Sequence, residues 1–471
     1  MAISEFTDEL RLRVENAGDA ISHALFEPVI RLGVTGLARS GKTVFITSLV
    51  ANMLDRGRMP QLVAQREGRI EAAFLRPQPD DTVPRFDYES HMAALTGPEP
   101  HWPDSTRAVS ELRLSLRVRP AGLLAGLQRP RTVHVDIVDY PGEWLLDLGL
   151  MDKSYGEWSA QVLDRISERG EAKDYLSLMR GVDGTATLDE PTAQKLAAAF
   201  AGYLTRARDA GYVDCTPGRF LLPGDLAGSP VLTFAPLPPM ERPPRGSLGR
   251  EMARRFEAYK AQVVRPFFRD HFARIDRQVV LVDALGALHA GPRAVEDLRR
   301  ALGETLSAFR PGQNSFLRRL LGGKRVDRIL FAATKADHLH HVQHPQLTAI
   351  MQTMLRDASD RIAFAGAETR ALSLASWRAT TEEMRAHNGT ELPCVRGRLI
   401  DGGGQAAFYP GALPDNPAQL LSTAAQGGAQ WLDAEFQAMA FAPAPLHLKP
   451  GDGPPHIRLD RAADFLIGDR L

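Results

Sequence analysis

The sequence has 471 residues, which is enough for a core with a large insertion or for two domains. Its 57 basic and 57 acidic residues give a formal net charge of zero, which argues against a nucleic-acid-binding protein and against a polybasic membrane-binding surface. The hydrophobic content of 44% is ordinary for a soluble globular chain, and no run of apolar residues is long enough to predict a transmembrane helix.

The start of the chain and its cysteine content both predict a cytoplasmic protein. Residues 1–18 carry acidic side chains early and lack the apolar centre of a secretory signal. Cys215 and Cys394 are the only cysteines, which is typical of a reducing compartment and excludes a zinc site built from several cysteines. Apolar residues at helical spacing predict a helix over residues 1–28, packed beside the first strand.

The most informative stretch of the sequence is Val29 to Leu49. An apolar run predicts a buried strand, and an apolar helical pattern starts at Val44. Between them, residues 36–43 read GLARSGKT, which matches the P-loop pattern G-x-x-x-x-G-K-[ST] in the strand-to-helix context that the motif requires. With the Gly and Lys frequencies of this chain, the pattern arises by accident in roughly one chain in a hundred or fewer.

A P-loop predicts how a phosphate chain is held. Its glycines let successive backbone N–H groups point at the phosphates, and the start of the helix adds the positive end of the helix dipole. Lys42 brings a positive charge to the outer phosphates, and the hydroxyl of Thr43 can ligate Mg²⁺. The residues of this segment predicted to bind nucleotide are Gly36, Ala38, Arg39, Ser40, Gly41, Lys42 and Thr43.

Residues 55–105 are predicted to form a long loop that leads to the first switch of a GTPase. The segment contains seven prolines and little periodicity, and loops of this length inside a compact domain are usually functional. An alternating strand pattern follows at 110–120. We predict that Thr106 ligates Mg²⁺ and senses the γ-phosphate, with Ser105 as the alternative. An ordinary turn or capping residue is the other interpretation of Thr106.

Residues 131–144 predict the third strand and the second switch. The apolar residues of 133–138 form a buried strand pattern that ends at Asp139, and the sequence continues DYPGE. Asp139 is predicted to hold Mg²⁺ through its water, and the N–H of Gly142 to meet the γ-phosphate. Glu143 stands where many GTPases have the glutamine that orients the attacking water; a solvated acidic residue is the alternative.

The rest of the chain completes an α/β fold. Further strands are predicted within 277–288, at 329–333 and at 369–374, with a helix at about 294–309. We predict a P-loop NTPase fold of the GTPase type: a mostly parallel, six-stranded sheet with helices on both faces and a large helical insertion. The predicted divisions are a core of residues 1–144 and 275–381, a helical insertion of 145–274 and a C-terminal extension of 382–471.

The strand at 329–333 ends in a motif that distinguishes nucleotide bases. Thr334-Lys335-Ala336-Asp337 fits [NT]-K-x-D, in which the carboxylate accepts hydrogen bonds from N1–H and from the exocyclic amine of guanine while the lysine stem lies over the base. Adenine presents the wrong pattern, so the motif favours GTP. A strand end with a capping Asp is the alternative. Ala375 or Ser376, after the next strand, is predicted to offer an N–H to guanine O6.

Together these motifs resemble the YcjX-like family of bacterial P-loop proteins. The likeness is carried by GLARSGKT, WPDSTR ahead of SELRL, DYPGEW, TKAD and the closing PHIRLDRAADFLIGD, and it spans essentially the whole chain. The resemblance implies a GTPase-like core with a helical insertion and an association with the stress response. It also implies genomic company with a membrane protein, which is therefore a candidate partner. Members are often labelled ATPases, but Asp337 favours GTP.

The P-loop also resembles that of guanylate-binding proteins and atlastins, which have an arginine just before x-G-K. That resemblance implies that Arg39 acts as an arginine finger in cis, ordered by formation of a homodimer. Such a finger contributes roughly 10³–10⁵ in rate by neutralising charge in the transition state. Arg107 in the first switch is an alternative source of that charge. A salt bridge on the outer face of the loop is the other interpretation of Arg39.

The sequence therefore predicts a GTP-binding and GTP-hydrolysing protein that uses GTP/GDP and Mg²⁺. The predicted catalytic residues are Lys42, Arg39, Glu143 and Thr106, and the predicted metal ligands are Thr43, Thr106 and Asp139. One alternative is a slow nucleotide-dependent switch that acts through a protein docked on the insertion, and another is an ATPase that supplies energy to a partner protein. A kinase is disfavoured because no acceptor site is evident, and no nucleic-acid partner is expected.

Overall fold

The computed structural model describes residues 27–36, 39–104, 108–122, 129–308, 326–364, 367–425 and 436–471. The helix predicted over residues 1–28 falls almost entirely outside these ranges. Ala38 and the segment Ser105 to Arg107, which includes the predicted switch residue Thr106, also lie outside the described residues.

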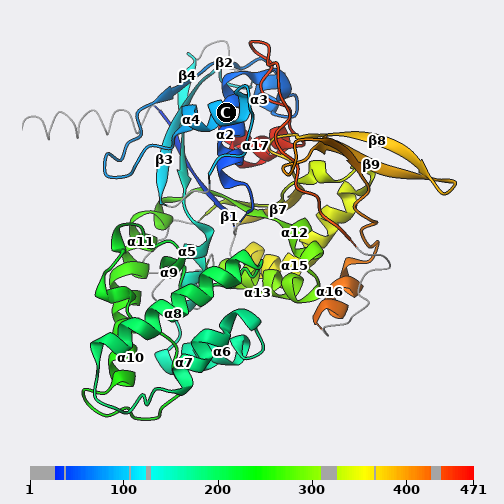
Figure 1. Ribbon diagram of the computed structural model, residues 1–471. Coiled ribbons are helices and arrows are strands. Elements are labelled where there is room, and N and C mark those ends of the chain that lie inside the picture. The colour runs from blue at the N-terminus through cyan, green and yellow to red at the C-terminus, as the bar shows by residue number, and fades with distance from the viewer. Residues whose placement is uncertain are drawn as a thin grey trace, which may run out of the picture.

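A seven-stranded mixed sheet forms the centre of the molecule (Figure 1), in the order β2-β3-β4-β1-β5-β6-β7. β1 pairs in parallel with β4 and β5, and β6 and β7 continue the parallel part, whereas β3 is antiparallel to both β2 and β4. The mostly parallel α/β fold predicted from the sequence is confirmed. The strands are β1 Val29–Gly36, β2 Ile70–Arg76, β3 Ser110–Val118, β4 Arg131–Asp139, β5 Arg277–Val282, β6 Arg328–Ala333 and β7 Glu368–Ser373.

The prediction of six strands is wrong by one, because β2 lies within the stretch expected to be a loop. β2 is an edge strand that pairs only with β3, and its register shifts between Ile70 and Ala72. Most of its side chains are half-buried rather than alternately buried and exposed. A strand whose side chains are mostly half-buried lacks the strong two-residue periodicity on which a prediction from sequence depends.

The two faces of the sheet pack against different sets of helices. On one face, Leu32 and Leu281 contact the apolar sides of α2 (Lys42–Leu54) and α17 (Leu459–Ile467). On the other face, Val280 and Phe331 belong to a larger core that includes residues of α5, α6, α8, α10, α13 and α15. Since α2 begins directly after the P-loop, this packing fixes the loop at the carboxyl end of β1.

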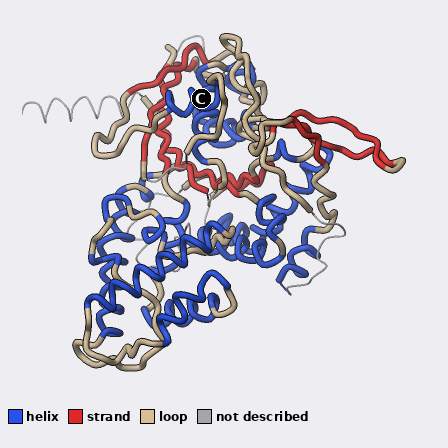
Figure 2. The backbone as a smooth tube through the Cα atoms, viewed as in Figure 1, coloured by secondary structure: helices blue, strands red, loops and turns tan. Residues whose placement is uncertain are grey.

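Helices fill most of the chain between β4 and β5 and gather at one end of the molecule (Figure 2). Their interior is rich in aromatic contacts, such as Trp158 stacked on Phe256 with ring centroids 4.9 Å apart. The helices predicted in this segment are confirmed. Its helices are α5 Gly142–Leu146, α6 Tyr155–Ile166, α7 Lys173–Arg180, α8 Glu190–Asp209, α9 Gly218–Leu221, α10 Leu248–Tyr259 and α11 Arg265–Asp270.

The other helices belong to the part of the chain that carries the main sheet and the C-terminal region. Among the described residues, no helix has both the length and the apolar character needed to cross a bilayer. These helices are α3 Val63–Arg66, α4 Tyr88–Thr96, α12 Ala284–Ala290, α13 Pro292–Ala308, α15 His344–Phe364 and α16 Pro417–Ala425.

The C-terminal region adds a second, antiparallel sheet of three strands in the order β10-β9-β8. These strands are β8 Thr380–His387, β9 Thr390–Arg398 and β10 Gln405–Phe408. β8 and β9 form a two-stranded arm that projects away from the main sheet (Figure 1). The arm starts beside the TKAD motif, because β8 begins at Thr380 and the Thr380 hydroxyl donates to the carbonyl oxygen of Asp337.

Candidate nucleotide-binding site

The two glycines of the P-loop pattern, Gly36 and Gly41, both lie where glycine is required or favoured. A Cβ on Gly36 would lie 2.1 Å from Ser40 Oγ and 2.9 Å from the carbonyl oxygen of Leu281, so only glycine fits there. Gly41 has φ 80°, a left-handed conformation that glycine adopts without strain. Lys42 Nζ donates to the carbonyl oxygen of Gly36 at 3.3 Å, which folds the lysine over the loop. These features of Gly36, Gly41 and Lys42 are typical of an anion-binding turn at a helix start.

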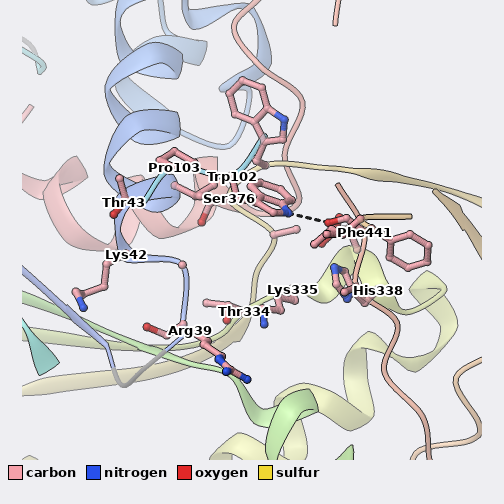
Figure 3. A pocket seen from close by; sticks show the side chains of 18 residues that line it. Arg39, Lys42, Thr43, Trp102, Pro103, Thr334, Lys335, His338, Ser376 and Phe441 are labelled. Carbon is pink, nitrogen blue, oxygen red and sulfur yellow. Dashed lines mark hydrogen bonds between the residues drawn. The ribbon is translucent and has the colours of Figure 1, made fainter. Parts of the chain in front are cut away.

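A cavity of about 360 Å³ lies against this loop (Figure 3). It gathers residues that the sequence analysis singled out from three separate segments: the P-loop, the TKAD motif and the loop after β7. Arg39, Lys42 and Thr43 lie at one side of the view, and His338 and Phe441 lie at the other. The lining residues predicted from the sequence are Arg39, Ser40, Gly41, Lys42, Thr43, Thr334, Lys335, Asp337, Ala375 and Ser376.

The TKAD motif is held rigidly at the end of β6. Thr334 N–H donates to the carbonyl oxygen of Val282 at 2.8 Å, and Lys335, with φ 59°, is hydrogen-bonded through Nζ to the carboxylate of Asp283. Asp337 is only 4% exposed, and its Oδ2 accepts a hydrogen bond from Ala379 N–H at 2.8 Å. The backbone of the β8 start therefore fixes the orientation of the carboxylate that lines the cavity.

The loop after β7 separates the two residues predicted to meet guanine O6. Ala375 N–H donates to the carbonyl oxygen of Ile457 at 3.2 Å, so that donor is already used. The carbonyl oxygen of Ser376 accepts a hydrogen bond from Ser48 in α2, which ties the loop to the P-loop helix. Both residues line the cavity. Ser376 is therefore the better of the two alternatives for an N–H directed at a base.

Oxygen atoms suited to Mg²⁺ lie near the end of β1. Thr43 Oγ1 donates to the carbonyl oxygen of Asp104 at 3.5 Å, which brings the segment just before the predicted first switch against the P-loop helix. Asp139 is fully buried at the end of β4 and lies opposite Val34 of β1. A hydroxyl and a carboxylate from these two elements are ligand types that Mg²⁺ prefers, so the residues fit that ion.

The second-switch residues do not lie on the cavity wall: Asp139 ends β4, and Gly142 and Glu143 begin the buried helix α5. Asp139, Gly142 and Glu143 are not among the described residues that line the cavity. α5 packs beneath α9, where a Cβ on Gly218 would come within 2.4 Å of the carbonyl oxygen of Glu143. Trp144 lies edge-on to Phe267 at 5.2 Å between ring centroids. This segment is therefore in direct contact with the helical region.

Glu143 does not line the cavity, although its predicted role of orienting the attacking water needs a position there. Its side chain is 8% exposed and Oε2 makes no hydrogen bond with any described residue. The carboxylate is near Cys215: burial raises the pKa of that thiol well above its usual value, and the neighbouring carboxylates Asp214 and Glu143 raise it further. A role for Glu143 in orienting water stays a prediction, and it requires the side chain to turn from the helical region toward the cavity.

Asp147, just after α5, is a buried acid whose ionisation should affect stability. Burial raises its pKa to about 7, although hydrogen bonds from donors that include Tyr259 Oη and Gly218 N–H favour the charged form. Between its ordinary pKa near 4 and about 7, the unfolded chain has lost this proton while the folded chain keeps it. Stability is therefore lost as the pH rises through this range and levels off above it.

We expect Asp147→Asn, which is neutral at every pH, to remove this pH dependence. Between pH 5 and pH 7, urea unfolding should show that the free energy of unfolding of the wild type falls by about 2–3 kcal/mol relative to that of the variant. Asp174→Asn, at a side chain that is 86% exposed, is the matched control and should follow the wild type. Parallel pH profiles for Asp147→Asn and the wild type would contradict the raised pKa.

The sequence did not identify several residues of the cavity wall. Trp102 and Pro103 come from the segment before the first switch, Trp377 from the loop after β7, and Ile400, Ala440 and Phe441 from the C-terminal region. The conspicuous WPD sequence was a signal for the first two. No local pattern around the C-terminal residues predicted that they would reach the cavity.

Comparisons with known proteins agree over almost the full length of the chain. The model of the YcjX-like family matches residues 30–471. The "Ras-like GTPase YcjX" of Escherichia coli K12 is 40% identical over 474 residues, which cover 98% of this chain and 99% of the relative. The protein of the same name from Shewanella oneidensis is 34% identical over 492 residues, with 98% of each covered. The chain belongs to the YcjX-like family.

Proposed function

We propose that the protein binds GTP and GDP with Mg²⁺, hydrolyses GTP and acts as a nucleotide-dependent switch. The observation that carries this proposal is that one cavity is lined both by the P-loop residues and by Asp337. A nucleotide with its phosphates at Lys42 would have its base near Asp337, where a fixed carboxylate suits the two donors of guanine. The names of the two relatives, Ras-like GTPases, support the same activity.

The proposed roles follow from the sequence motifs and, for the described residues, from their positions as well. The phosphates are bound by Lys42 and by N–H groups of the P-loop, which include those of Gly36, Ala38, Ser40 and Gly41. Thr43, Asp139 and Thr106 are the proposed ligands of Mg²⁺, which would neutralise charge on the outer phosphates. The proposed base site is formed by Thr334, Lys335, Asp337, Ala375 and Ser376. Gly142 is the proposed sensor of the γ-phosphate at the start of α5.

Arg39 is the proposed source of positive charge for the transition state. It lines the cavity beside Lys42, and no carboxylate among the described residues forms an ion pair with it. This absence argues against the salt-bridged alternative within the described part of the chain. Its φ of 62° is unusual for a residue with a side chain, and such strain is often kept at functional sites. Glu143 is a further proposed catalytic residue, subject to the reorientation described above.

A nucleotide-dependent switch is the form of this activity that we favour. Gly142 begins α5, and α5 is packed against α9 and Phe267 of the helical region. A movement of Gly142 toward a γ-phosphate would therefore be passed to the helices between β4 and β5, where a protein partner could read it. We further propose that this partner is a membrane protein, that the protein forms a homodimer, and that it acts in the cytoplasm during the stress response. The predicted division into core, insertion and extension is also part of this proposal.

Displacement of fluorescent GDP from the purified full-length protein tests the proposal. With Mg²⁺ present, GTP and GDP should compete and ATP and ADP should not. Equal competition by ATP would favour the alternative of an ATPase coupled to another protein, and the assigned roles of Lys335 and Asp337 would then fall while the P-loop assignment stood. Proteolysis that differs between the GTP-bound and GDP-bound forms would support the switch.

A further inference from the structure

One wall of the nucleotide cavity comes from a segment far along the chain. Residues 439–443, which we call the C-terminal strap, run antiparallel to the end of β9: Ile400 N–H donates to the carbonyl oxygen of Ala440, and Ala442 N–H donates to that of Arg398. Ile400, Ala440 and Phe441 line the cavity. The strap therefore pairs with the residues at the end of β9 and reaches the nucleotide site.

Trp102 connects this strap to the segment before the first switch. Its indole Nε1–H donates to the carbonyl oxygen of Phe441 at 2.7 Å, a bond drawn in Figure 3. Arg398 adds a second connection, because its Nη2 donates both to the carbonyl oxygen of Pro100 and, at 3.1 Å, to that of Pro443. Trp102 also packs on the small apolar cluster of Ala379, Val395 and Phe441.

The same strap touches the base-binding motif. The ring of Phe441 lies edge-on to the ring of His338, with centroids 5.2 Å apart, and His338 directly follows Asp337. Trp102, His338 and Phe441 all line the cavity. The strap therefore holds together the segments of Trp102 and His338, which are more than 200 residues apart in the sequence. We call the end of the cavity lined by Asp337, where the base would bind, the base end.

We propose that the strap closes the base end of the cavity through Trp102, so that the Trp102–Phe441 contact sets the rate of nucleotide release. The inference rests on the proposed binding of guanine nucleotide. Trp102 is a positioning residue in this scheme: it is held by Phe441 and Arg398 on one side and borders the bound nucleotide on the other. A nucleotide leaves when Trp102 separates from the strap.

Release of mant-GDP from the full-length protein, chased with excess GDP in Mg²⁺, tests the inference. Trp102→Phe keeps an aromatic ring but removes the N–H, and should speed release about 10-fold, the value of one hydrogen bond in a partly buried site. Trp102→Ala also removes the ring and should speed release about 100-fold. Arg398→Ala, which leaves Trp102 intact but removes the second connection, should speed release about 5-fold.

Trp158→Phe is the matched control, since it makes the same chemical change within the helical region. Trp158 Nε1 makes no hydrogen bond with any described residue, and its ring stacks on Phe256. Melting temperatures separate the proposed role from general destabilisation: Trp102→Phe should melt no lower than Trp158→Phe and still release nucleotide faster.

The possible failures are distinguishable. If the wild type does not bind mant-GDP at all, the proposed function falls and the inference falls with it. If the wild type binds mant-GDP but Trp102→Phe, Arg398→Ala and Trp158→Phe all release it at the wild-type rate, the strap does not control release and the proposed function stands. If Trp102→Phe proves insoluble, Arg398→Ala alone decides between these outcomes.

Discussion

Arg39→Ala is expected to lower kcat for GTP hydrolysis about 10³-fold and to change the affinity for GDP by less than about threefold. The guanidinium lines the cavity on the side of Lys42 and Thr43, where charge develops when the γ-phosphate leaves. GDP lacks that phosphate, so a group that acts on the transition state contributes little to its binding. Single-turnover hydrolysis and mant-GDP titration measure the two quantities separately.

Two companion variants separate the guanidinium from the backbone at this position. Arg39 has φ 62°, so Arg39→Gly removes the same charge while relieving backbone strain. This variant should hydrolyse GTP as slowly as Arg39→Ala. Arg66→Ala, at an exposed arginine of α3, is the control for loss of an arginine elsewhere and should hydrolyse GTP at the wild-type rate. Wild-type turnover in both Arg39 variants would exclude a catalytic role for this arginine.

Asp337→Asn is expected to exchange the base preference of the site, with affinity for GDP falling on the order of 10³-fold and xanthosine diphosphate binding in its place. The structure gives a specific reason. Ala379 N–H donates to Oδ2 of Asp337, so an asparagine must direct its carbonyl oxygen there and its Nδ2 donor toward the cavity. The Nδ2 donor repels the exocyclic amine of guanine, but it can donate a hydrogen bond to the oxygen that xanthine has at that position.

Competition of GDP, XDP and ADP against mant-labelled nucleotides measures the exchange. Asp183→Asn, at an exposed aspartate of the helical region, is the control and should retain the preference for GDP. A variant that loses GDP binding without gaining XDP binding would indicate that Asp337 is structural. Unchanged preference in Asp337→Asn would show that the TKAD sequence is an ordinary strand end.

The parts of the fold that could be predicted are those specified by short stretches of sequence. The P-loop, its flanking strand and helix, and the TKAD turn each depend on residues within about a dozen positions, such as Gly36, whose missing Cβ leaves room for Ser40. β2 was missed because an edge strand with half-buried side chains has no clear alternation. The burial of Glu143 against the helical region depends on Cys215 and Gly218, which are more than 70 residues away.

The candidate site shows the same limit. Asp337 could be predicted from its motif, but the bond from Ala379 that orients its carboxylate depends on where β8 begins. Phe441 reaches the cavity only because the strap pairs with the end of β9. Contacts of this kind arise from tertiary packing, and a single sequence carries no local signal for them.

The geometry of the β8–β9 arm has a mechanical consequence. β9 extends over nine residues from Thr390, at the tip, to Arg398, which is bonded to Pro100 and Pro443. At about 3.3 Å per residue, the tip is roughly 30 Å from that end. Because the strand is continuous, a force applied at the tip acts as a torque on Arg398 and Ile400. A protein that grips the arm can thus pull on the wall of the cavity without touching the nucleotide.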